Sequence, residues 1–404
     1  MVYKIEKYCL FGWLSLLISP ILCIPFAFYG MIKVRKWGFS IWAVFMGLLG
    51  ILYPPTGDIY RYYVDFKTIS NVSWDNFIFF LTFRNDYLLF LIEYILSRLN
   101  LNFEIYKFLY NFISYYLLGN LFIDIVNCHN KKLSPNEKIL FLFTIITFSI
   151  SSFLFRFDFS KILFIYGSYK IIYSSNNYGW LYVFVACLNH LSIVILAFFL
   201  LLAKYKLFSF SRQTIIIICL ICMTIDPSLA TSILKFLPVS IINHYAIYLD
   251  GYWAGDFLND HSLLFRLQRF ISIGITYIAI LIYIAIYNKR NLKKENLVNG
   301  MILITTLSSP FITIFYRFSS VLFLVIKFYF LRYYNYSRKS YYCLIVLFAL
   351  TMTSNFMGLW SIRRQIEISK LEQIVFPAPY IICFSYSDSW VSNNVFDNGD
   401  FKHD

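Results

Sequence analysis

The stretch PPTGDIYRYYVDF, residues 54–66, follows a long apolar run and is itself dense in polar groups. It places Asp58, Arg61 and Asp65 among tyrosines. The residues around it are almost all compatible with hydrocarbon, and a membrane interior offers no water to such a cluster. The cluster must therefore lie at a membrane surface or in a wet cavity. We expect the rest of the chain to form the membrane framework that holds it opposite other isolated charges.

The composition of the 404-residue chain is that of a polytopic membrane protein. Hydrophobic residues make up 59% and charged residues only 14%, whereas a soluble domain carries about 25% charged residues. The net charge of +14 does not indicate nucleic-acid binding, because the lysines and arginines lie in short clusters between apolar runs. The pair Cys219 and Cys222 lies inside an apolar run, and no outer loop carries an Asp-x-Asp pair. We therefore expect no metal and no cofactor.

The first two apolar runs set the expected topology, since a crossing needs about 20 apolar residues. The run at 9–29 is expected to be one retained helix, kinked at Pro20 and Pro25. The basic loop at 33–36 would then be cytoplasmic, and the second run, 37–53, would lead to residues 54–66 on the outer side. Both chain termini are expected outside.

Two later stretches do not fit single ordinary crossings. Residues 73–100 are interrupted by charges and are expected to form a re-entrant or surface-lying segment on the outer side, with a normal crossing as the alternative. Residues 180–203 are long enough to cross once, but one crossing would put the next lysines outside. Splitting this stretch at Asn189-His190 restores the charge rule and places His190 at the tip of a membrane hairpin.

The sequence therefore predicts an all-α polytopic integral membrane protein with about ten transmembrane helices, re-entrant segments and outer-side loops. We expect one transmembrane domain over residues 1–404, with outer loops at about 54–100 and 237–262 and a polar C-terminal tail at 361–404. The remaining crossings are expected at 105–126, 139–155, 159–173, 214–236, 263–287, 301–315, 318–330 and 341–360.

Isolated arginines dominate the expected outer side, where the positive-inside rule would not place them. They are Arg61, Arg84, Arg156, Arg266, Arg269 and Arg317. The planar guanidinium suits phosphate and diphosphate oxygens, and a polyprenyl diphosphate in the outer leaflet would present that ligand at this depth. The alternative is that these arginines reach lipid headgroups or pair with nearby aspartates.

Two residues are candidates for proton transfer. His190 is the histidine expected within the apolar framework near the outer face, and Asp58 is its competitor. A histidine satisfied within the core is the alternative for His190.

Aromatic residues beside carboxylates suggest contacts to sugar rings, which stack on aromatic faces and hydrogen-bond to carboxylates. The candidates are Tyr62 in the first outer loop and Asp250, Trp253 and His261 in the second. Lipid-facing or packing roles are the alternative for the aromatic rings.

Three local patterns resemble the EpsG/Wzy-type family of polysaccharide polymerases. They are Gly57-Asp58 followed by Arg61-Tyr62, Arg156 opening a helix with His190-Leu191-Ser192 downstream, and Arg317 starting a late helix. The family commonly has Arg-Gln where this chain has Arg156-Phe157. The resemblance implies a metal-independent glycosyltransferase of the bacterial inner membrane that acts on the periplasmic side. Such enzymes transfer a growing glycan from undecaprenyl diphosphate to the next lipid-linked repeat unit of O-antigen or another surface polysaccharide.

On this resemblance, Arg156, Arg317 and Arg61 would hold the diphosphate, and His190 or Asp58 would deprotonate the acceptor hydroxyl. The implied partners are the lipid-linked oligosaccharide, membrane lipids, a chain-length regulator and a flippase, with no nucleic acid. Three other functions remain open: an O-antigen ligase, a lipid-linked oligosaccharide flippase or other transporter, and a membrane-bound O-acyltransferase.

Overall fold

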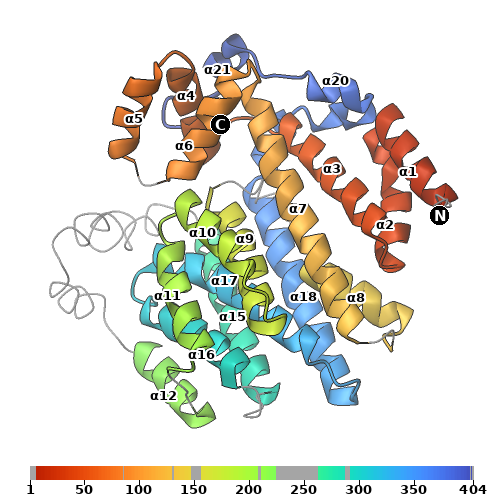
Figure 1. Ribbon diagram of the computed structural model, residues 1–404, viewed down its shortest axis with the longest axis vertical. Helices are drawn as coiled ribbons and strands as arrows, with labels where there is room; N and C mark the ends of the chain where they lie inside the picture. Colours follow the sequence, from red (N-terminus) through yellow and green to blue (C-terminus); the bar gives the residue numbers. More distant parts are fainter. Residues whose placement is uncertain are drawn as a thin grey trace. The chain divides into compact units, whose positions relative to one another are not determined.

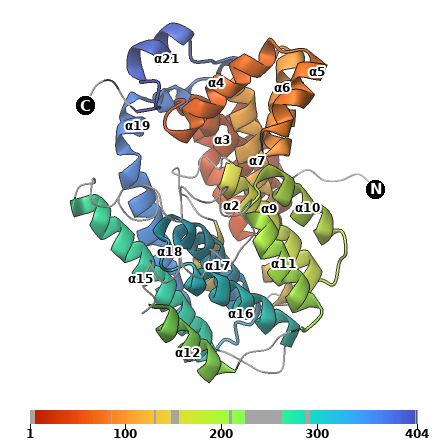
Figure 2. The same cartoon turned by 90° about the vertical axis from the view of Figure 1, so that its left-hand side faces the viewer.

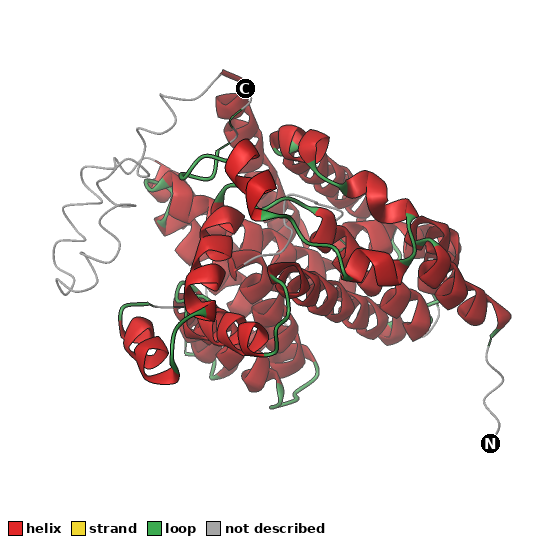
Figure 3. Ribbon diagram, turned by 90° about the horizontal axis from the view of Figure 1, so that it is seen from above, coloured by secondary structure: helices red, strands yellow, loops and turns green. Residues whose placement is uncertain are grey.

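The computed structural model describes residues 6–84, 86–129, 132–146, 156–207, 211–223, 263–286, 292–400 and 402. Every regular element within these ranges is a helix, and none is a strand (Figure 3). The predicted all-α class is confirmed. The chain forms two compact units. The first comprises Met1–Gly167, Tyr178–Ile193 and Asn355–Asp404, and the second comprises Ser168–Asn177 and Val194–Ser354.

Within the described ranges, four helices are long and apolar enough to cross a membrane. They are Phe103–Cys128, Arg266–Ile286, Ile312–Arg332 and Arg338–Ser361. Apolar helices of 10–17 residues accompany them, which is shorter than the roughly 20 residues of a full crossing. The chain thus has the helices of a helical membrane protein, and the count of ten crossings stays a prediction.

The first unit is built on α3 (Lys36–Leu52), which packs along α7 (Phe103–Cys128) (Figure 1). Glycines allow this close approach. A Cβ atom on Gly47 would lie 2.7 Å from the Phe108 ring, and one on Gly50 would lie 2.6 Å from the Asn111 side chain. Small residues at a helix interface let the two backbones come near enough for dispersion contacts to accumulate.

The first apolar run forms a helical hairpin, so the predicted single kinked helix over 9–29 is wrong. Its elements are α1 (Lys7–Ile18), η1 (Pro20–Cys23) and α2 (Ile24–Ile32). The ring centroids of Tyr8 and Tyr29 lie 4.8 Å apart, so the two arms run antiparallel. The chain reverses where Ser19 becomes extended and Pro20, which lacks an N–H donor, ends the first arm.

This reversal corrects the expected position of the N-terminal end. Glu6, just before α1, forms an ion pair of 3.1 Å with Arg35 in the basic turn after α2. The start of α1 and the basic loop at 33–36 therefore lie at the same end of the first unit, whereas the topology prediction puts them on opposite sides.

The turn after α2 is a Schellman motif with an unusual residue in it. Arg35 N donates to Gly30 O at 2.8 Å, and Val34 N donates to Met31 O at 2.9 Å. Val34 occupies the left-handed position with φ 58°, where glycine is normally found and where a β-branched side chain is strained.

Val34→Gly should therefore stabilise the protein by about 1 kcal/mol, because glycine has no Cβ atom to clash in the left-handed backbone conformation. The thermal unfolding midpoint in detergent measures this change. Val34→Ala is the matched control. It keeps the Cβ atom and should gain little, and a lower midpoint for Val34→Gly than for Val34→Ala would contradict the assignment.

Three short helices lie beyond the end of α3: α4 (Asp58–Ser70), α5 (Trp74–Thr82) and α6 (Tyr87–Arg98) (Figure 2). The predicted alternative of one ordinary crossing over residues 73–100 is wrong, because α5 ends at Thr82 and α6 starts only at Tyr87. Two of the charges that interrupt the apolar pattern, Arg84 and Asp86, fall in this connection, whereas Glu93 lies inside α6.

The C-terminal segment, residues 363–400, packs against α4. Its elements are α19 (Arg363–Ile368), η5 (Leu371–Val375), α20 (Ala378–Ile382) and α21 (Asp388–Asn394). Gly57 N donates to Gly399 O at 2.9 Å, and Tyr63 OH donates to Asp388 Oδ1 at 2.5 Å. Lys67 also pairs with Asp388. The predicted polar tail thus lies beside residues 54–66, as expected for two segments on one side of the membrane.

A buried lysine fixes the connection between α3 and α4. Lys107 on α7 has no exposed surface, and its Nζ donates to Ile51 O at 3.1 Å and to Tyr53 O at 2.6 Å. These carbonyls belong to the last turn of α3 and the residue after it. The last carbonyls of a helix have no N–H donor within the helix, so Lys107 supplies one. Glu104, one turn away, lies 4.0 Å from Lys107 Nζ and accepts from Tyr386 N at 3.3 Å.

The second unit contains α11 (Ile193–Lys204), α12 (Arg212–Met223), α15 (Leu263–Ile286), α16 (Leu292–Leu307), α17 (Ile312–Arg332) and most of α18 (Arg338–Ser361). The turn between α16 and α17 contains Pro310, which a helix interior does not accept. The predicted crossings at 301–315 and 318–330, with an outer turn at Arg317, are therefore wrong in their boundaries, since Arg317 lies inside α17.

Candidate functional site

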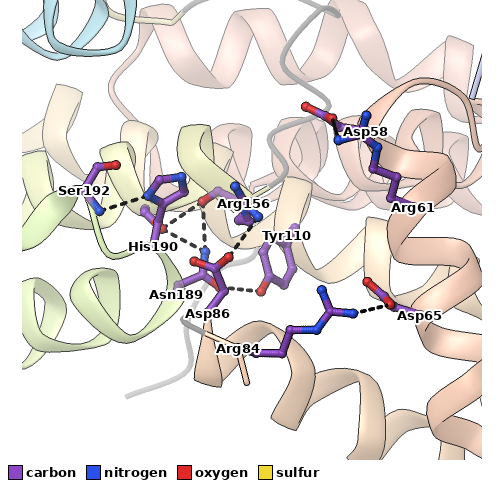
Figure 4. Close-up of polar contacts among 11 residues, drawn as sticks. Asp58, Arg61, Asp65, Arg84, Asp86, Tyr110, Arg156, Asn189, His190 and Ser192 are labelled. Atoms are coloured by element: carbon purple, nitrogen blue, oxygen red, sulfur yellow. Dashed lines mark hydrogen bonds and ion pairs between the residues drawn. The ribbon is translucent and has the colours of Figure 1, made fainter. Parts of the chain in front are cut away.

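Arg156 is the first residue of α9 (Arg156–Tyr173) and forms the centre of a polar cluster in the first unit (Figure 4). Its Nη1 atom lies 2.8 Å from Asp86 Oδ2, and its guanidinium carbon lies 5.8 Å from the Tyr62 ring centroid. Asp86 is the N-cap residue of α6, and its side chain is 12% exposed against 31% for Arg156. The arginine is thus held in place and still accessible.

Asn189 joins three helices beside this arginine. It is the last residue of α10 (Gly179–Asn189), which runs antiparallel to α9. Its Nδ2 donates to Arg156 O at 2.9 Å and to Ser160 Oγ at 2.8 Å, and its Oδ1 accepts from Tyr110 OH at 2.6 Å. Asn189 is fully buried, so these bonds satisfy most of the hydrogen-bonding capacity of its amide and fix the start of α9.

His190 follows in extended conformation, and the predicted break at Asn189-His190 is confirmed, because α11 begins only at Ile193. Lys204 at the end of α11 donates to Asn177, just before α10, at 3.2 Å, so the chain between them reverses direction. The His190 side chain is 5% exposed, and its ring centroid lies 5.2 Å from that of Phe157. Its Nδ1 accepts from Ser192 N at 3.2 Å.

A second ion pair lies nearby in the helices after residue 57. Arg84 Nη2 lies 3.1 Å from Asp65 Oδ1, and the guanidinium carbon lies 4.8 Å from the Phe80 ring centroid and 5.2 Å from that of Phe90. The planar guanidinium is thereby held between aromatic rings while one edge pairs with the carboxylate.

Glu93 on α6 is fully buried, and neither of its carboxyl oxygens has a hydrogen-bond partner. Burial raises the pKa of Glu93 well above its ordinary value, the negative charge of Asp65 raises it further, and Arg84 opposes the shift. Burial therefore favours the neutral, protonated form of this carboxyl group.

Glu93→Gln should therefore become more stable relative to the wild type as the pH rises. With a raised pKa in the folded state, the stabilising contribution of Glu93 is complete below its unfolded pKa, 4.5, and is lost as the pH rises through the folded value. Unfolding midpoints of both proteins at pH 5 and pH 8 measure this difference. Glu372→Gln, on an exposed glutamate, is the control, and a Glu93→Gln difference that is the same at both pH values would contradict the prediction.

Two predicted residues lie apart from the Arg156 cluster. Asp58 and Arg61 form a pair of 3.6 Å near the start of α4, with side chains 81% and 66% exposed. Figure 4 shows this pair away from Asp86 and Arg156. Tyr62, from the same turn of α4, is instead buried at 7% exposure beside Arg156.

The other predicted residues are divided between the second unit and the parts of the chain that are not described. Arg317 lies in the second turn of α17, where its carbonyl accepts from Ser320 Oγ at 2.8 Å. Asp250, Trp253 and His261 fall outside the described residues. In the part of the chain that the structure describes, no three His, Cys, Asp or Glu side chains converge as a metal site would require.

The sequence prediction did not single out Tyr110 or Ser160, and it treated Asp86 and Glu93 only as charges that pair or interrupt. A signal for Tyr110 exists in the sequence. Tyr106, Tyr110 and Ser114 recur every four residues within an apolar run, so they share one face of α7. A polar stripe on a membrane helix turns toward the protein interior.

Comparison with known proteins gives no match for this chain, whether with the models of protein families, with the curated proteins or with the solved structures.

Proposed function

We propose that this chain is a glycosyltransferase that joins lipid-diphosphate-linked oligosaccharide units at the outer face of the bacterial inner membrane, as a polymerase of surface polysaccharide. One observation carries the proposal: Arg156 and the Asn189-His190 break, which are 33 residues apart in the chain, share a hydrogen bond of 2.9 Å at the start of α9. Ionisable residues within an apolar framework are functional by default, and here a partly exposed arginine stands beside an interrupted helix.

The chemistry of such a transfer needs cations where the diphosphate leaves. The guanidinium of Arg156 offers two parallel donors to phosphate oxygens. The first turn of α9 adds backbone N–H groups, because the leading N–H groups of a helix have no intrahelical partner. Asp86 pairs with the arginine at 2.8 Å, and a diphosphate with greater negative charge would compete for the same donors.

The hydrogen bond at His190 affects its role. Nδ1 accepts from Ser192 N, so in the neutral ring the proton belongs on Nε2. In this tautomer His190 donates from Nε2, which suits binding an anionic oxygen of the leaving group. The Asp58 side chain is exposed on α4. The acceptor sugar would therefore have to meet this carboxylate at the solvent-facing surface of the protein.

Gel analysis of surface polysaccharide tests the proposal in a strain deleted for the gene, with and without the gene on a plasmid. A polymerase predicts that the ladder collapses to core plus one repeat unit and that the plasmid restores it. Loss of even the single unit would assign a ligase or flippase. A full ladder that lacks acetyl groups would assign an acyltransferase.

A further inference from the structure

The N-terminal hairpin forms an open pocket of about 510 Å3 beside the start of α1. This volume lies within the range of about 300–1,000 Å3 that is usual for ligand sites. The start of α1, the end of α2 and the Schellman turn line it, with the residues Glu6, Lys7, Tyr8, Tyr29, Lys33 and Arg35. We refer to this site as the basic pocket.

The basic pocket carries a net positive charge. Three cationic side chains line it against the single carboxylate of Glu6. That carboxylate is already engaged, since it pairs with Arg35 at 3.1 Å and accepts from Trp37 Nε1 at 3.1 Å. Two lysine charges, those of Lys7 and Lys33, therefore exceed the negative charge present, and an anion is the ligand that the pocket favours.

Its walls combine these cations with aromatic rings. The rings of Tyr8 and Tyr29 lie 4.8 Å apart, and Lys33 Nζ lies 5.8 Å from the Tyr29 centroid. Tyrosine and lysine together are typical of the boundary between lipid and water, where the ring packs against apolar groups and the polar ends face the headgroups.

The turn that presents Lys33 and Arg35 is held at an energetic cost. Val34 between them is in the left-handed region, and strain of this kind, about 1–3 kcal/mol, persists where the surrounding structure fixes it and is frequent at ligand sites. The two hydrogen bonds of the Schellman turn fix the backbone on both sides of Val34.

The helix that leaves the basic pocket is apolar on its exposed surface. Leu10, Phe11, Leu14, Leu17 and Ile18 of α1 are all between 44% and 65% exposed. A run of exposed apolar side chains along one helix is compatible with acyl chains and unfavourable in water. A lipid whose chains lie along α1 would place its headgroup at the basic pocket.

We propose that the basic pocket binds the phosphodiester headgroup of an anionic phospholipid, with its acyl chains along α1. Basic clusters mark the cytoplasmic side of membrane proteins, and basic pockets on that side accept anionic headgroups. The lipid would fix the hairpin at the cytoplasmic leaflet. This binding is independent of the proposed glycosyltransferase activity.

Native mass spectrometry of the full chain in detergent, titrated with phosphatidylglycerol and with phosphatidylcholine, tests the proposal. The wild type should retain phosphatidylglycerol and not phosphatidylcholine. Lys7→Gln/Lys33→Gln should weaken phosphatidylglycerol binding about thirtyfold, since each cation contributes about fivefold. This variant keeps the Glu6–Arg35 ion pair, and its unfolding midpoint without lipid verifies the fold.

Lys132→Gln/Lys138→Gln is the matched control, with the same change of charge at two lysines outside the basic pocket, one before α8 (Pro135–Ile145) and one within it. It should bind phosphatidylglycerol as the wild type does. Equal weakening in both double variants would overturn the proposal in favour of unspecific attraction. Equal retention of the two lipids would also overturn it. Displacement of the lipid by millimolar inorganic phosphate alone would assign a free-anion site instead. If Lys7→Gln/Lys33→Gln fails to fold, Lys33→Arg should bind the lipid as the wild type does, and Lys33→Gln should bind it about fivefold more weakly.

Discussion

Arg156→Ala should abolish polymer formation, leaving core and single repeat units on the gel. The guanidinium of Arg156 is anchored by Asp86 at 2.8 Å and stands at the beginning of α9. In phosphoryl transfer, an arginine that stabilises developing charge on phosphate oxygens is worth about 10³–10⁵ in rate. Here the diphosphate is the leaving group, and alanine offers its oxygens neither charge nor donors. Arg156→Lys keeps the charge without the planar pair of donors, so it should restore only a small part of the activity.

Plasmid-borne variants in the deletion strain measure this effect, with immunoblotting to establish equal amounts of protein in the membrane. Arg363→Ala is the control, because Arg363 is an exposed arginine of the same unit that stacks on Trp360. It should give a ladder of normal length. Wild-type chain lengths from Arg156→Ala would remove Arg156 from the site and with it the central argument for the proposed function.

Lys107→Met should destabilise the first unit by about 3–5 kcal/mol, the usual cost of removing one member of a buried ion pair. Lys107 Nζ donates to Ile51 O and Tyr53 O, and Glu104 lies 4.0 Å away with 2% of its side chain exposed. Methionine fills a similar volume and provides no donors. Two carbonyls and one carboxylate would then remain buried without their cation.

Thermal unfolding in detergent measures this loss, and Glu104→Gln/Lys107→Met is the matched control. The double variant removes both charges, while the glutamine oxygen still accepts from Tyr386 N. It should recover part of the stability lost in Lys107→Met, because replacing both members of a buried pair costs less than removing one. A single variant as stable as the wild type would show that the two carbonyls find other donors.

Rules that use only local sequence were sufficient to predict the break between α10 and α11. The positive-inside rule predicted the break at Asn189-His190, because a single crossing over 180–203 would have put the following lysines on the outer side of the membrane. Arg156 lies beside Asn189 because α9 and α10 are consecutive antiparallel helices. Contacts between neighbours in sequence follow from where helices begin and end.

Hydropathy alone could not predict that the first apolar run, residues 9–29, forms a helical hairpin. A window of 20 apolar residues looks the same whether the chain continues or reverses, and the decisive residues were Ser19 and Pro20. Two prolines had been interpreted as kinks in one helix. At Arg317 the helix boundary was missed for a related reason, since Pro310 marks the preceding turn.

The remaining parts of the site depend on contacts between distant residues. Tyr110 and Asn189 are 79 positions apart, and their hydrogen bond of 2.6 Å depends on how α7 meets α10. Asp86 reaches Arg156 because α6 packs against α7 and α10 within the first unit. No periodicity of either helix encodes these pairs, although the buried polar stripe on α7 indicates which face would take part.

The hydrogen bond between Gly57 and Gly399 has a consequence for biosynthesis. A ribosome adds about 5–20 residues per second, so Gly57 is made roughly 20 to 70 seconds before Gly399. During that time α1, α2, α3 and α7 can insert and pack, while the start of α4 lacks its final acceptor. The end of the first unit that contains residues 54–66 is therefore completed only after Gly399 is made, and changes in residues 363–400 would act on residues 54–66, far away in the sequence.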